Sequence, residues 1–315
     1  MKKAIATVGV IAVVLGGLLG AFIYKPTQMY DQNSKRFVCI INPGTYYWAD
    51  VWKGMEAADQ EFGSDTKYNE FARFDIEEQI HLLKKVSYMQ ADGVITIGEP
   101  YSEEVNEAIR EIVDAGIPVV LVDTDSKESG RACYVGSDNY EAGRLAAQKM
   151  REETGGEAKI AVFISQINSA NQQERLRGFE DVIKSEEGME IVTIIEGEAD
   201  KLKIQEDFKR MRRENPQIDA IFCAEATSSV QVGVLLGEQE AEKLTIVGFD
   251  VISALNYVET GLYEGVIAQD GFAMGYEAVK FLCEYEEDQE DKEIFTDVVC
   301  ITKDNVDEYR QKREN

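Results

Sequence analysis

Three polar side chains follow apolar segments of strand length in this sequence. Asp123 comes directly after residues 118–122, Asp250 after residues 246–249, and Gln269 closes a third such segment. In a parallel α/β sheet, ligands collect outside the carboxyl ends of the strands, so polar groups there converge on one molecule. Carboxylates accept hydrogen bonds, and an amide both accepts and donates them. The arrangement predicts a binding site for a small polar ligand.

The elements that must position these residues alternate along the chain from residue 36. Val105, Ala108, Ile109 and Ile112 form a one-sided apolar stripe with helical spacing. Continuous apolar strands separated by amphipathic helices are typical of βαβ units, whose parallel sheet is covered on both faces. The fold class is therefore predicted to be α/β. The predicted strands are residues 37–41, 93–97, 118–122, 159–164, 191–195, 219–223, 244–247, 265–268 and 298–301.

Two such series are joined end to end. Residues 134–139 read as a polar break, and a new strand and helix series begins at Lys159. A chain of 315 residues is long enough for two compact domains.

The order of the motifs resembles that of type I periplasmic sugar-binding proteins of the ribose-binding group. Their fold is shared by the effector domains of lactose-repressor-type regulators. The resemblance covers about residues 36–302 and rests on the spacing of several short motifs together. These motifs are Tyr47-Trp48 and residues 91–95, 115–123, 136–143, 173–179, 219–223, 247–250 and 268–269.

The resemblance implies two doubly wound lobes, joined by a hinge of three chain crossings, that close over a ligand. The first lobe would comprise residues 36–136 and 271–297, and the second residues 137–270 and 298–302. Residues 303–315 would form a C-terminal tail.

By the same resemblance, eight residues are candidates for ligand binding. Aromatic faces at the start of the first helix would stack on the C–H faces of a sugar ring. Strand-end carboxylates would accept hydrogen bonds from hydroxyl groups, and a planar arginine fork would donate to ring oxygens. The candidates are Tyr47, Trp48, Asp123, Ser137, Arg175, Glu225, Asp250 and Gln269.

Three departures from the family pattern bear on the ligand. Glu225 stands where the family often has Asn, and Thr124 stands where an Arg often follows the first strand-end Asp. The Asn expected after residues 93–97 is missing, so Glu99 or Ser102 would serve instead. An excess of buried carboxylates is unfavourable unless it is paired. The sequence therefore favours a ligand richer in hydrogen-bond donors than ribose, such as one that bears an amine.

The composition argues against several other functions. The net charge of −26 repels phosphate backbones, so no nucleic-acid partner is expected. The single histidine, His81, is predicted on a helix surface, and no nucleophile elbow or phosphate-binding loop is found. The five cysteines contain no CxxC pair, so no metal site is expected. We expect no cofactor and no catalytic residue, hence no enzyme. The acidic run 284–293 reads as a solvated loop.

The N-terminus has the pattern of a targeting segment. Lys2 and Lys3 precede an apolar stretch over residues 4–24, which approaches the ~20 residues needed to span a bilayer. We interpret residues 1–35 as an uncleaved signal anchor with its linker, with a cleaved signal peptide as the alternative. Either places residues from about 36 onward outside the cytoplasm.

Three readings of the function remain open, the last of them an autoinducer-type signal receptor of the same fold, which Glu225 and Thr124 leave open. In the first, the protein delivers a monosaccharide or derivative to the permease of an ABC transporter. In the second, it is an anchored receptor that reports the ligand to a membrane sensor kinase or a chemoreceptor. A transcriptional regulator would need a DNA-binding element where this chain has the apolar segment.

Overall fold

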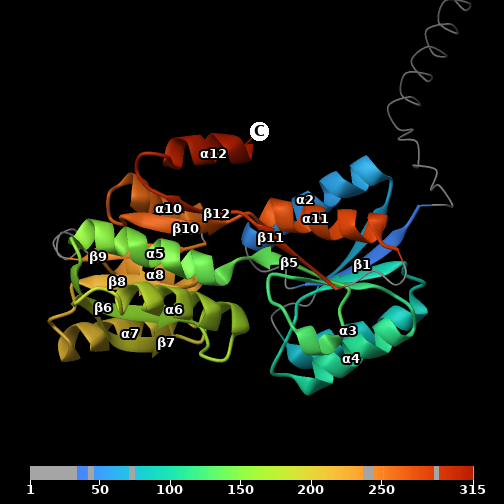
Figure 1. Cartoon of the computed structure of the whole chain (residues 1–315), viewed down its shortest axis with the longest axis horizontal. Helices are drawn as coiled ribbons and strands as arrows, with labels where there is room; N and C mark the ends of the chain where they lie inside the picture. Colours follow the sequence, from blue (N-terminus) through green and yellow to red (C-terminus); the bar gives the residue numbers. More distant parts are fainter. Residues whose placement is uncertain are drawn as a thin grey trace, which may run out of the picture. The chain divides into compact units, whose positions relative to one another are not determined.

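The described part of the chain forms two lobes, each built on one sheet (Figure 1). It is seen in a computed structural model that describes residues 34–41, 46–70, 75–236, 244–250, 252–286 and 291–314. The predicted α/β class with two parallel-sheet lobes is confirmed. Nearly all of the predicted signal anchor lies outside the described residues. Among those residues, no helix combines the length and apolarity that a bilayer crossing requires.

The first sheet has six parallel strands in the order β11-β5-β4-β3-β1-β2. Helices α2 and α11 cover one face of this sheet, and α3 and α4 cover the other. Its strands are β1 (Arg36–Ile41), β2 (Asp65–Glu70), β3 (Gly93–Thr96), β4 (Val119–Val122), β5 (Cys133–Ser137) and β11 (Lys292–Thr296). Its helices are α2 (Tyr46–Phe62), α3 (Ile76–Lys85), α4 (Glu103–Asp114) and α11 (Gly271–Glu284), with 3-10 turns η1 (Val86–Tyr88) and η2 (Lys127–Ser129).

The second sheet has the order β12-β10-β9-β8-β6-β7 and is parallel except for β12, which pairs antiparallel with β10. Helices α5 and α6 pack on one face, and α7, α8, α10 and α12 on the other. Its strands are β6 (Glu157–Ile164), β7 (Gly188–Glu196), β8 (Ala220–Cys223), β9 (Thr245–Phe249), β10 (Gly265–Gln269) and β12 (Val298–Ile301). Its helices are α5 (Asn139–Thr154), α6 (Ala170–Ile183), α7 (Lys201–Glu214), α8 (Ala226–Leu235), α10 (Ile252–Glu259) and α12 (Val306–Glu314).

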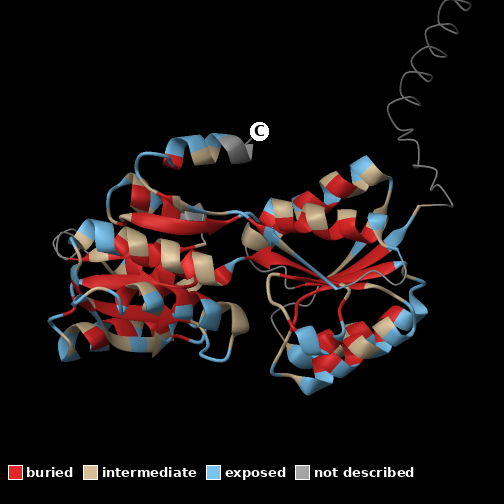
Figure 2. Ribbon diagram, in the orientation of Figure 1, coloured by how far each residue is buried: buried red, intermediate tan, exposed pale blue. Residues whose placement is uncertain are grey.

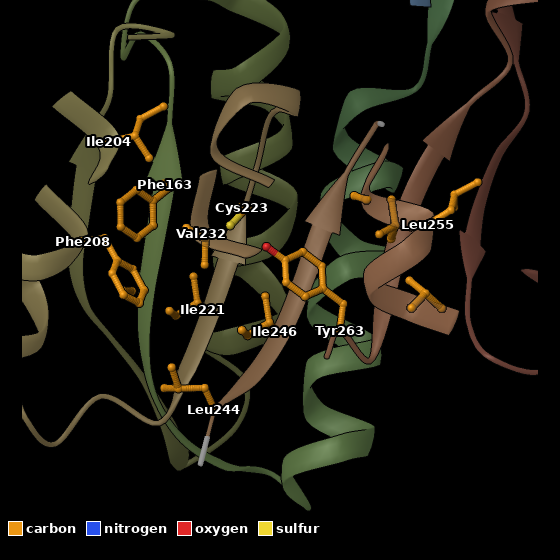
Figure 3. Packing of buried hydrophobic residues seen from close by; sticks show 14 of the residues in the cluster. Phe163, Ile204, Phe208, Ile221, Cys223, Val232, Leu244, Ile246, Leu255 and Tyr263 are labelled. Carbon is orange, nitrogen blue, oxygen red and sulfur yellow. The ribbon is translucent and has the colours of Figure 1, made fainter. Parts of the chain in front are cut away.

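Strands β3, β4, β8 and β10 are buried along their whole length, and β1, β6 and β9 are buried except near their first residues (Figure 2). Helices cover both faces of each sheet, so both sides of a central strand are buried. Such strands are therefore continuously apolar in sequence and do not alternate between apolar and polar residues. In the second lobe, Phe163, Phe208 and Tyr263 fill the space between the sheet and helices α7, α8 and α10 (Figure 3). The buried phenol of Tyr263 donates to the carbonyl of Ser229 at 2.6 Å, so its polar end is satisfied.

The chain passes between the two sheets three times. The passages lie between β5 and α5, between β10 and α11, and between β11 and β12. Asp138 and Asp270 cap the helices that begin at the first two passages, by accepting the N–H groups of Glu141 and Ala273. These caps fix where each helix starts immediately after its crossing.

Two predictions about chain segments were wrong. Residues 134–139 are not a break, because Cys133–Ser137 form the buried strand β5 between β4 and β11. Part of the run 284–293, predicted as a loop, is ordered: Glu284 ends α11, and Lys292 and Glu293 begin β11. Strands β2 and β11 went unpredicted because they are polar edge strands. Residues 287–290 lie outside the described residues.

The C-terminal segment docks on the second lobe. Val306 of α12 is 2% exposed and belongs to the core beside α10. Arg310 donates to the side chains of Glu259 and Asn256, the latter at 2.7 Å. Helix α12 is therefore part of the second lobe's packing.

Candidate functional site

Asp123 and Asp250 occupy equivalent places in the two lobes. Each follows a central parallel strand, β4 or β9, and each has a left-handed backbone, with φ of 65° and 53°. Non-glycine residues rarely adopt this conformation, although Asp tolerates it better than most. The N–H of Asp123 donates to the carbonyl of Val135 at 3.0 Å, and that of Asp250 to the carbonyl of Ile267 at 2.8 Å. Backbone hydrogen bonding to the neighbouring strand therefore continues up to the aspartate, whose left-handed backbone ends the strand.

Asp123 is surrounded by hydrogen-bond donors. Its Oδ1 accepts the hydroxyl of Tyr47 at 2.8 Å. Its Oδ2 accepts the hydroxyl of Thr124 at 3.0 Å and the amide of Asn171 at 3.2 Å. Burial raises the pKa of the Asp123 carboxyl, and these donors partly oppose that rise. The carboxylate is thus fixed in orientation and incompletely compensated in charge.

Asp250 has one described side-chain donor. The amide Nε2 of Gln269, which is 5% exposed at the end of β10, donates to Oδ2 of Asp250 at 2.8 Å. Burial raises the pKa of Asp250 to about 7, although Gln269 and the charge of Arg175 act in the opposite direction. Asp250 is the less well paired of the two strand-end carboxylates.

Arg175 supplies the buried cation of the site. Its guanidinium carbon lies 3.4 Å from the centroid of the Phe249 ring, so the two groups stack. One terminal nitrogen donates to the carbonyl of Ala224 at 2.5 Å and the other to Oδ1 of Asn139 at 2.7 Å. Among the described residues, the Nε of Arg175 is buried and has no acceptor. Burial lowers the pKa of Arg175 to about 10, with Asp250 and Asp123 opposing the fall.

Tyr47 and Trp48 stand together at the start of α2. Their rings meet edge to face, with centroids 5.0 Å apart and planes at 69°. The phenol of Tyr47 contacts Asp123 and also the sulfur of Met274, at 3.0 Å. Burial and then the charge of Asp123 raise the pKa of Tyr47 well above 10, so the phenol stays a donor. Tyr47 therefore orients Asp123 in addition to offering a ring face.

Ser137 and Glu225 differ in how far their side chains are engaged. Ser137 ends β5, is 2% exposed, and its buried hydroxyl has no partner among the described residues. Glu225 is the N-cap of α8, and its two carboxylate oxygens each accept a backbone N–H at 2.6 Å, from Thr227 and Ser228. The structure therefore gives Glu225 a capping role.

Of the two alternatives after β3, Glu99 is the one electrostatically coupled to the site. Burial and then Asp123 raise the pKa of the half-buried Glu99 to about 7. Ser102 instead caps α4 by accepting the N–H of Val105 at 3.3 Å. A capping serine of this kind is explained by the helix alone.

Sequence reasoning missed Asn171, which reaches from α6 of the second lobe to Asp123 and to the hydroxyl of Thr124, 3.2 Å away. A signal was present, since Asn171 precedes Arg175 by four residues and so lies one helical turn away. A second bond between the lobes joins the hydroxyl of Tyr101 to Oε1 of Gln173 at 2.7 Å.

Two features relevant to catalysis and metals can be stated for the described residues. His81 is exposed on α3, as predicted for a helix-surface residue. In the part of the chain that the structure describes, no cluster of three His, Cys, Asp or Glu side chains could hold a metal ion.

The fold and this arrangement of strand-end carboxylates define a two-lobed binding protein. A family model described as the periplasmic binding protein domain matches residues 37–290, so the chain belongs to the periplasmic binding protein family. The D-allose-binding periplasmic protein of Escherichia coli (strain K12) is 23% identical over 251 residues, which cover 76% of this chain and 80% of that protein. The ribose import binding protein of the same strain matches over 53% of its own length, with 22% identity.

Solved structures agree with this assignment. A glucose-galactose binding protein from Geobacillus stearothermophilus is 32% identical, with a TM-score of 0.80, over 87% of this chain and 99% of that one. A chain of the XylFII-LytSN complex is 27% identical, with a TM-score of 0.77, over 86% of this chain and 98% of that one.

Proposed function

We propose that this protein is an extracytoplasmic solute-binding protein that captures a sugar or sugar derivative between its lobes. The observation that carries the proposal is that Asp123 and Asp250, left-handed strand-end carboxylates from different lobes, both act electrostatically on the buried Arg175. The known binders of allose, glucose and galactose among the similar proteins support a sugar ligand. Neither catalysis nor a cofactor is needed for this role.

The proposed contacts follow from the unsatisfied groups of the site. Asp123 and Asp250 would accept sugar hydroxyls, and charge-assisted bonds of this kind are about twice as strong as neutral ones. The unpartnered Nε of Arg175 would donate to a ligand oxygen. Gln269, already a donor to Asp250, would accept from the ligand through its oxygen. These groups fix orientation by hydrogen bonding rather than by charge pairing alone.

The remaining proposed contacts are apolar or hydroxyl contacts. Tyr47 and Trp48 would line the C–H faces of the sugar ring, where flat aromatic groups bury area with little loss of rotamer freedom. The buried, unpartnered hydroxyl of Ser137 would bond a ligand atom or a bridging water at the first crossing. Glu225 would contribute through the lone pairs that α8 leaves free.

Hinge closure would couple binding to a change of shape. We assign residues 36–136 and 271–297 to the first lobe and residues 137–270 and 298–302 to the second, on which α12 packs instead of forming a free tail, with hinge motion at the three crossings. The side chains of Asn171 and Tyr101 already form hydrogen bonds between the lobes. We therefore expect these two side chains to keep their positions when the lobes close. A ligand then favours closure only by its greater affinity for the closed state.

Two partners fit the closed state. Presentation of the ligand to the permease of an ABC transporter is the first, in keeping with the ribose import binding protein among the relatives. The second is contact with a membrane sensor kinase or chemoreceptor. The similar protein XylFII forms a complex with another protein, LytSN, which supports a protein partner of this kind. Deleting the protein separates them: transport predicts lost sugar uptake, whereas sensing predicts normal uptake with lost induction. The apolar residues 4–24 would anchor the protein in either case.

Thermal unfolding tests the binding proposal. The full-length chain in a mild detergent would be heated with D-ribose, D-allose, D-glucose, D-galactose, D-glucosamine and polyols. A ligand at 100 times its Kd adds ~2.7 kcal/mol to the free energy of unfolding. The shift should disappear in Asp250→Asn and persist in Asp270→Asn, which changes an exposed capping carboxylate instead. No shift with any of these compounds would refute a sugar ligand.

A further inference from the structure

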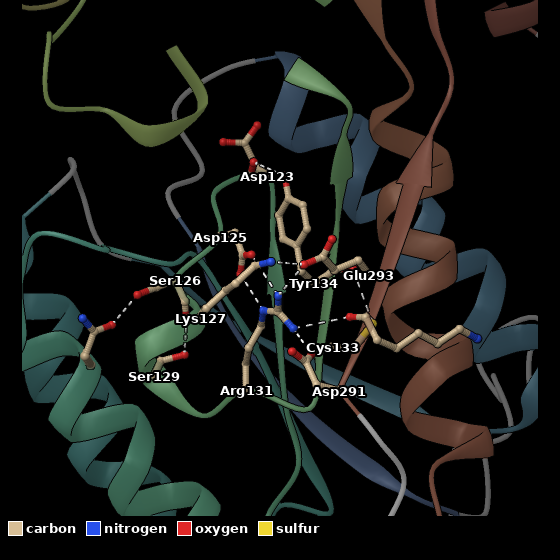
Figure 4. A network of polar contacts seen from close by, with 12 residues as sticks. Asp123, Asp125, Ser126, Lys127, Ser129, Arg131, Cys133, Tyr134, Asp291 and Glu293 are labelled. Atoms are coloured by element: carbon tan, nitrogen blue, oxygen red, sulfur yellow. Dashed lines mark hydrogen bonds and ion pairs between the residues drawn. The ribbon is translucent and has the colours of Figure 1, made fainter. Parts of the chain in front are cut away.

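Arg131 is a buried cation that holds two distant segments of the first lobe (Figure 4). Its side chain is 1% exposed. Its Nε and one terminal nitrogen donate to the two carboxylate oxygens of Asp125, at 2.5 and 2.8 Å. The other terminal nitrogen donates to the carboxylate of Asp291 and, at 3.4 Å, to the carbonyl of Lys292. Bidentate Arg–carboxylate pairs of this kind combine strength with geometric specificity.

The two segments are both tied to the proposed binding site. Asp125 lies two residues after the strand-end carboxylate Asp123, in the same turn. Asp291 immediately precedes β11, which begins at Lys292. Strand β11 runs in register with β5 up to the pair Thr296 and Ser137, and the chain then crosses to the second sheet. Arg131 therefore fastens the Asp123 turn to the strand that forms the third crossing.

Tyr134 forms a direct link between Arg131 and Asp123. Its ring centroid lies 5.9 Å from the guanidinium carbon, and its hydroxyl donates to the carbonyl of Asp123 at 2.9 Å. On β11, Phe295 meets the same ring edge to face at 6.2 Å. The left-handed φ of Asp123 is thus held from its own carbonyl and from the following turn, as a strained conformation requires.

The charges around Arg131 explain why its removal would loosen both segments. Asp125, Asp291 and Glu293 converge on it, and among the described residues the exposed Lys127 forms its ion pair with Glu293, at 2.6 Å. Without the buried cation, the carboxylates of the turn and of β11 repel each other across a partly desolvated gap. The turn that carries Asp123 would then separate from β11.

We propose that Arg131 is a positioning residue for ligand binding, one that locks the Asp123 turn and strand β11 into a single rigid unit without contacting the ligand. The proposal rests on the proposed function for its effect on affinity. The rigidity itself is independent of any ligand.

Hydrogen exchange and calorimetry on the full-length chain test the proposal together. Wild type is compared with Arg131→Met and with Arg151→Met, a matched control whose arginine pairs with Glu186 on the surface of the second lobe. In Arg131→Met, amides of residues 123–126 and 292–296 should exchange at least tenfold faster, with strand β6 unchanged. Affinity for whichever of D-galactose, D-glucose or D-ribose wild type binds should fall at least tenfold. The control should match wild type in both measurements.

A double-mutant cycle distinguishes positioning from general destabilisation. In an Asp123→Asn background, the effect of Arg131→Met on sugar affinity should shrink below twofold, because Asp123 no longer supplies the charge that Arg131 positions. Full additivity would overturn the proposal, as would unchanged exchange at residues 123–126. If wild type binds none of the three sugars, the exchange rates alone decide about Arg131, and the thermal-unfolding series decides separately about the proposed function. If Arg131→Met does not fold, Asp125→Asn and Asp291→Asn can be used to release the two segments separately. In each variant, amide hydrogen exchange should become faster only in the released segment.

Discussion

Replacing Asp250 by Asn should make the ligand-free protein more stable at neutral and alkaline pH while it weakens ligand binding. The substitution keeps the shape of the side chain and an oxygen that accepts from Gln269. It removes a charge that burial disfavours. In the proposed function that same charge accepts the ligand's hydroxyl groups, so stability and affinity should move in opposite directions.

The sign and size of the stability effect follow from the pKa. The Asp250 carboxyl has a pKa of about 7 in the folded protein against an ordinary value of 3.8. The folded state therefore holds its proton more tightly, and wild type loses stability as pH rises from about 4 to about 7. The full difference corresponds to about 4 kcal/mol, of which about 2 to 3 kcal/mol falls between pH 5 and pH 8. Asn carries no such penalty.

Urea unfolding at these two pH values, followed by far-UV circular dichroism, measures the effect. The gain of Asp250→Asn over wild type should grow by about 2 to 3 kcal/mol from pH 5 to pH 8. Asp270→Asn is the matched control, since Asp270 is an exposed N-cap and Asn caps equally well. Its difference from wild type should stay well below that of Asp250→Asn at pH 8.

Two results would refute this reasoning. One is an Asp250→Asn protein that is no more stable than wild type at pH 8. The other is a gain that is the same at both pH values, which would assign the effect to packing rather than to charge.

Three further outcomes are expected. Glu99→Gln should also gain stability relative to wild type as pH rises from 5 to 8, because the pKa of Glu99 is raised to about 7, and the same urea series measures it. Tyr134→Phe should lower the free energy of unfolding by about 1 to 2 kcal/mol, since the carbonyl of Asp123 loses its buried donor, and calorimetry should show weaker sugar binding. Gly143→Ala should destabilise the second lobe by about 1 to 3 kcal/mol and weaken binding, because the new methyl group would meet the backbone of Arg175 where α5 crosses α6, and urea midpoints with calorimetry check both effects.

The nine predicted strands all appear, because each carries an apolar run that is visible in the sequence, including the edge strands β7 and β12. The three strands that were not predicted were missed for two different reasons. Strands β2 and β11 lie at sheet edges and are rich in charged residues, so no apolar run marks them. Strand β5 is buried, but its sequence, Cys133–Ser137, passes directly into the polar cap Asp138 and so resembles a turn.

The candidate site was predictable where a residue's role follows from its place at a strand end, as for Asp123 and Asp250. Partners that arrive from another element left little trace in the sequence. The pairing of Tyr47 with Asp123 spans 76 positions, and that of Asn171 with Asp123 spans 48. Such pairings depend on how the elements pack, which periodicity does not encode. The Arg131 cluster is of the same kind, since Asp291 lies 160 positions away.

The charge of the site bears on the amine-bearing ligand that the sequence favours. That hypothesis counts Glu225, Glu99, Asp123 and Asp250 as four anions against one arginine. Both oxygens of Glu225 accept backbone N–H groups at the start of α8, where the helix dipole also stabilises a negative charge. Glu99 and Asp250, with pKa values of about 7, are each partly protonated at neutral pH. The excess of negative charge is therefore much smaller than four against one, and the donors around Asp123 offset part of it, so we expect a neutral sugar to bind. D-glucose should therefore stabilise the protein at least as well as D-glucosamine does. A preference for D-glucosamine would support the amine-bearing ligand instead.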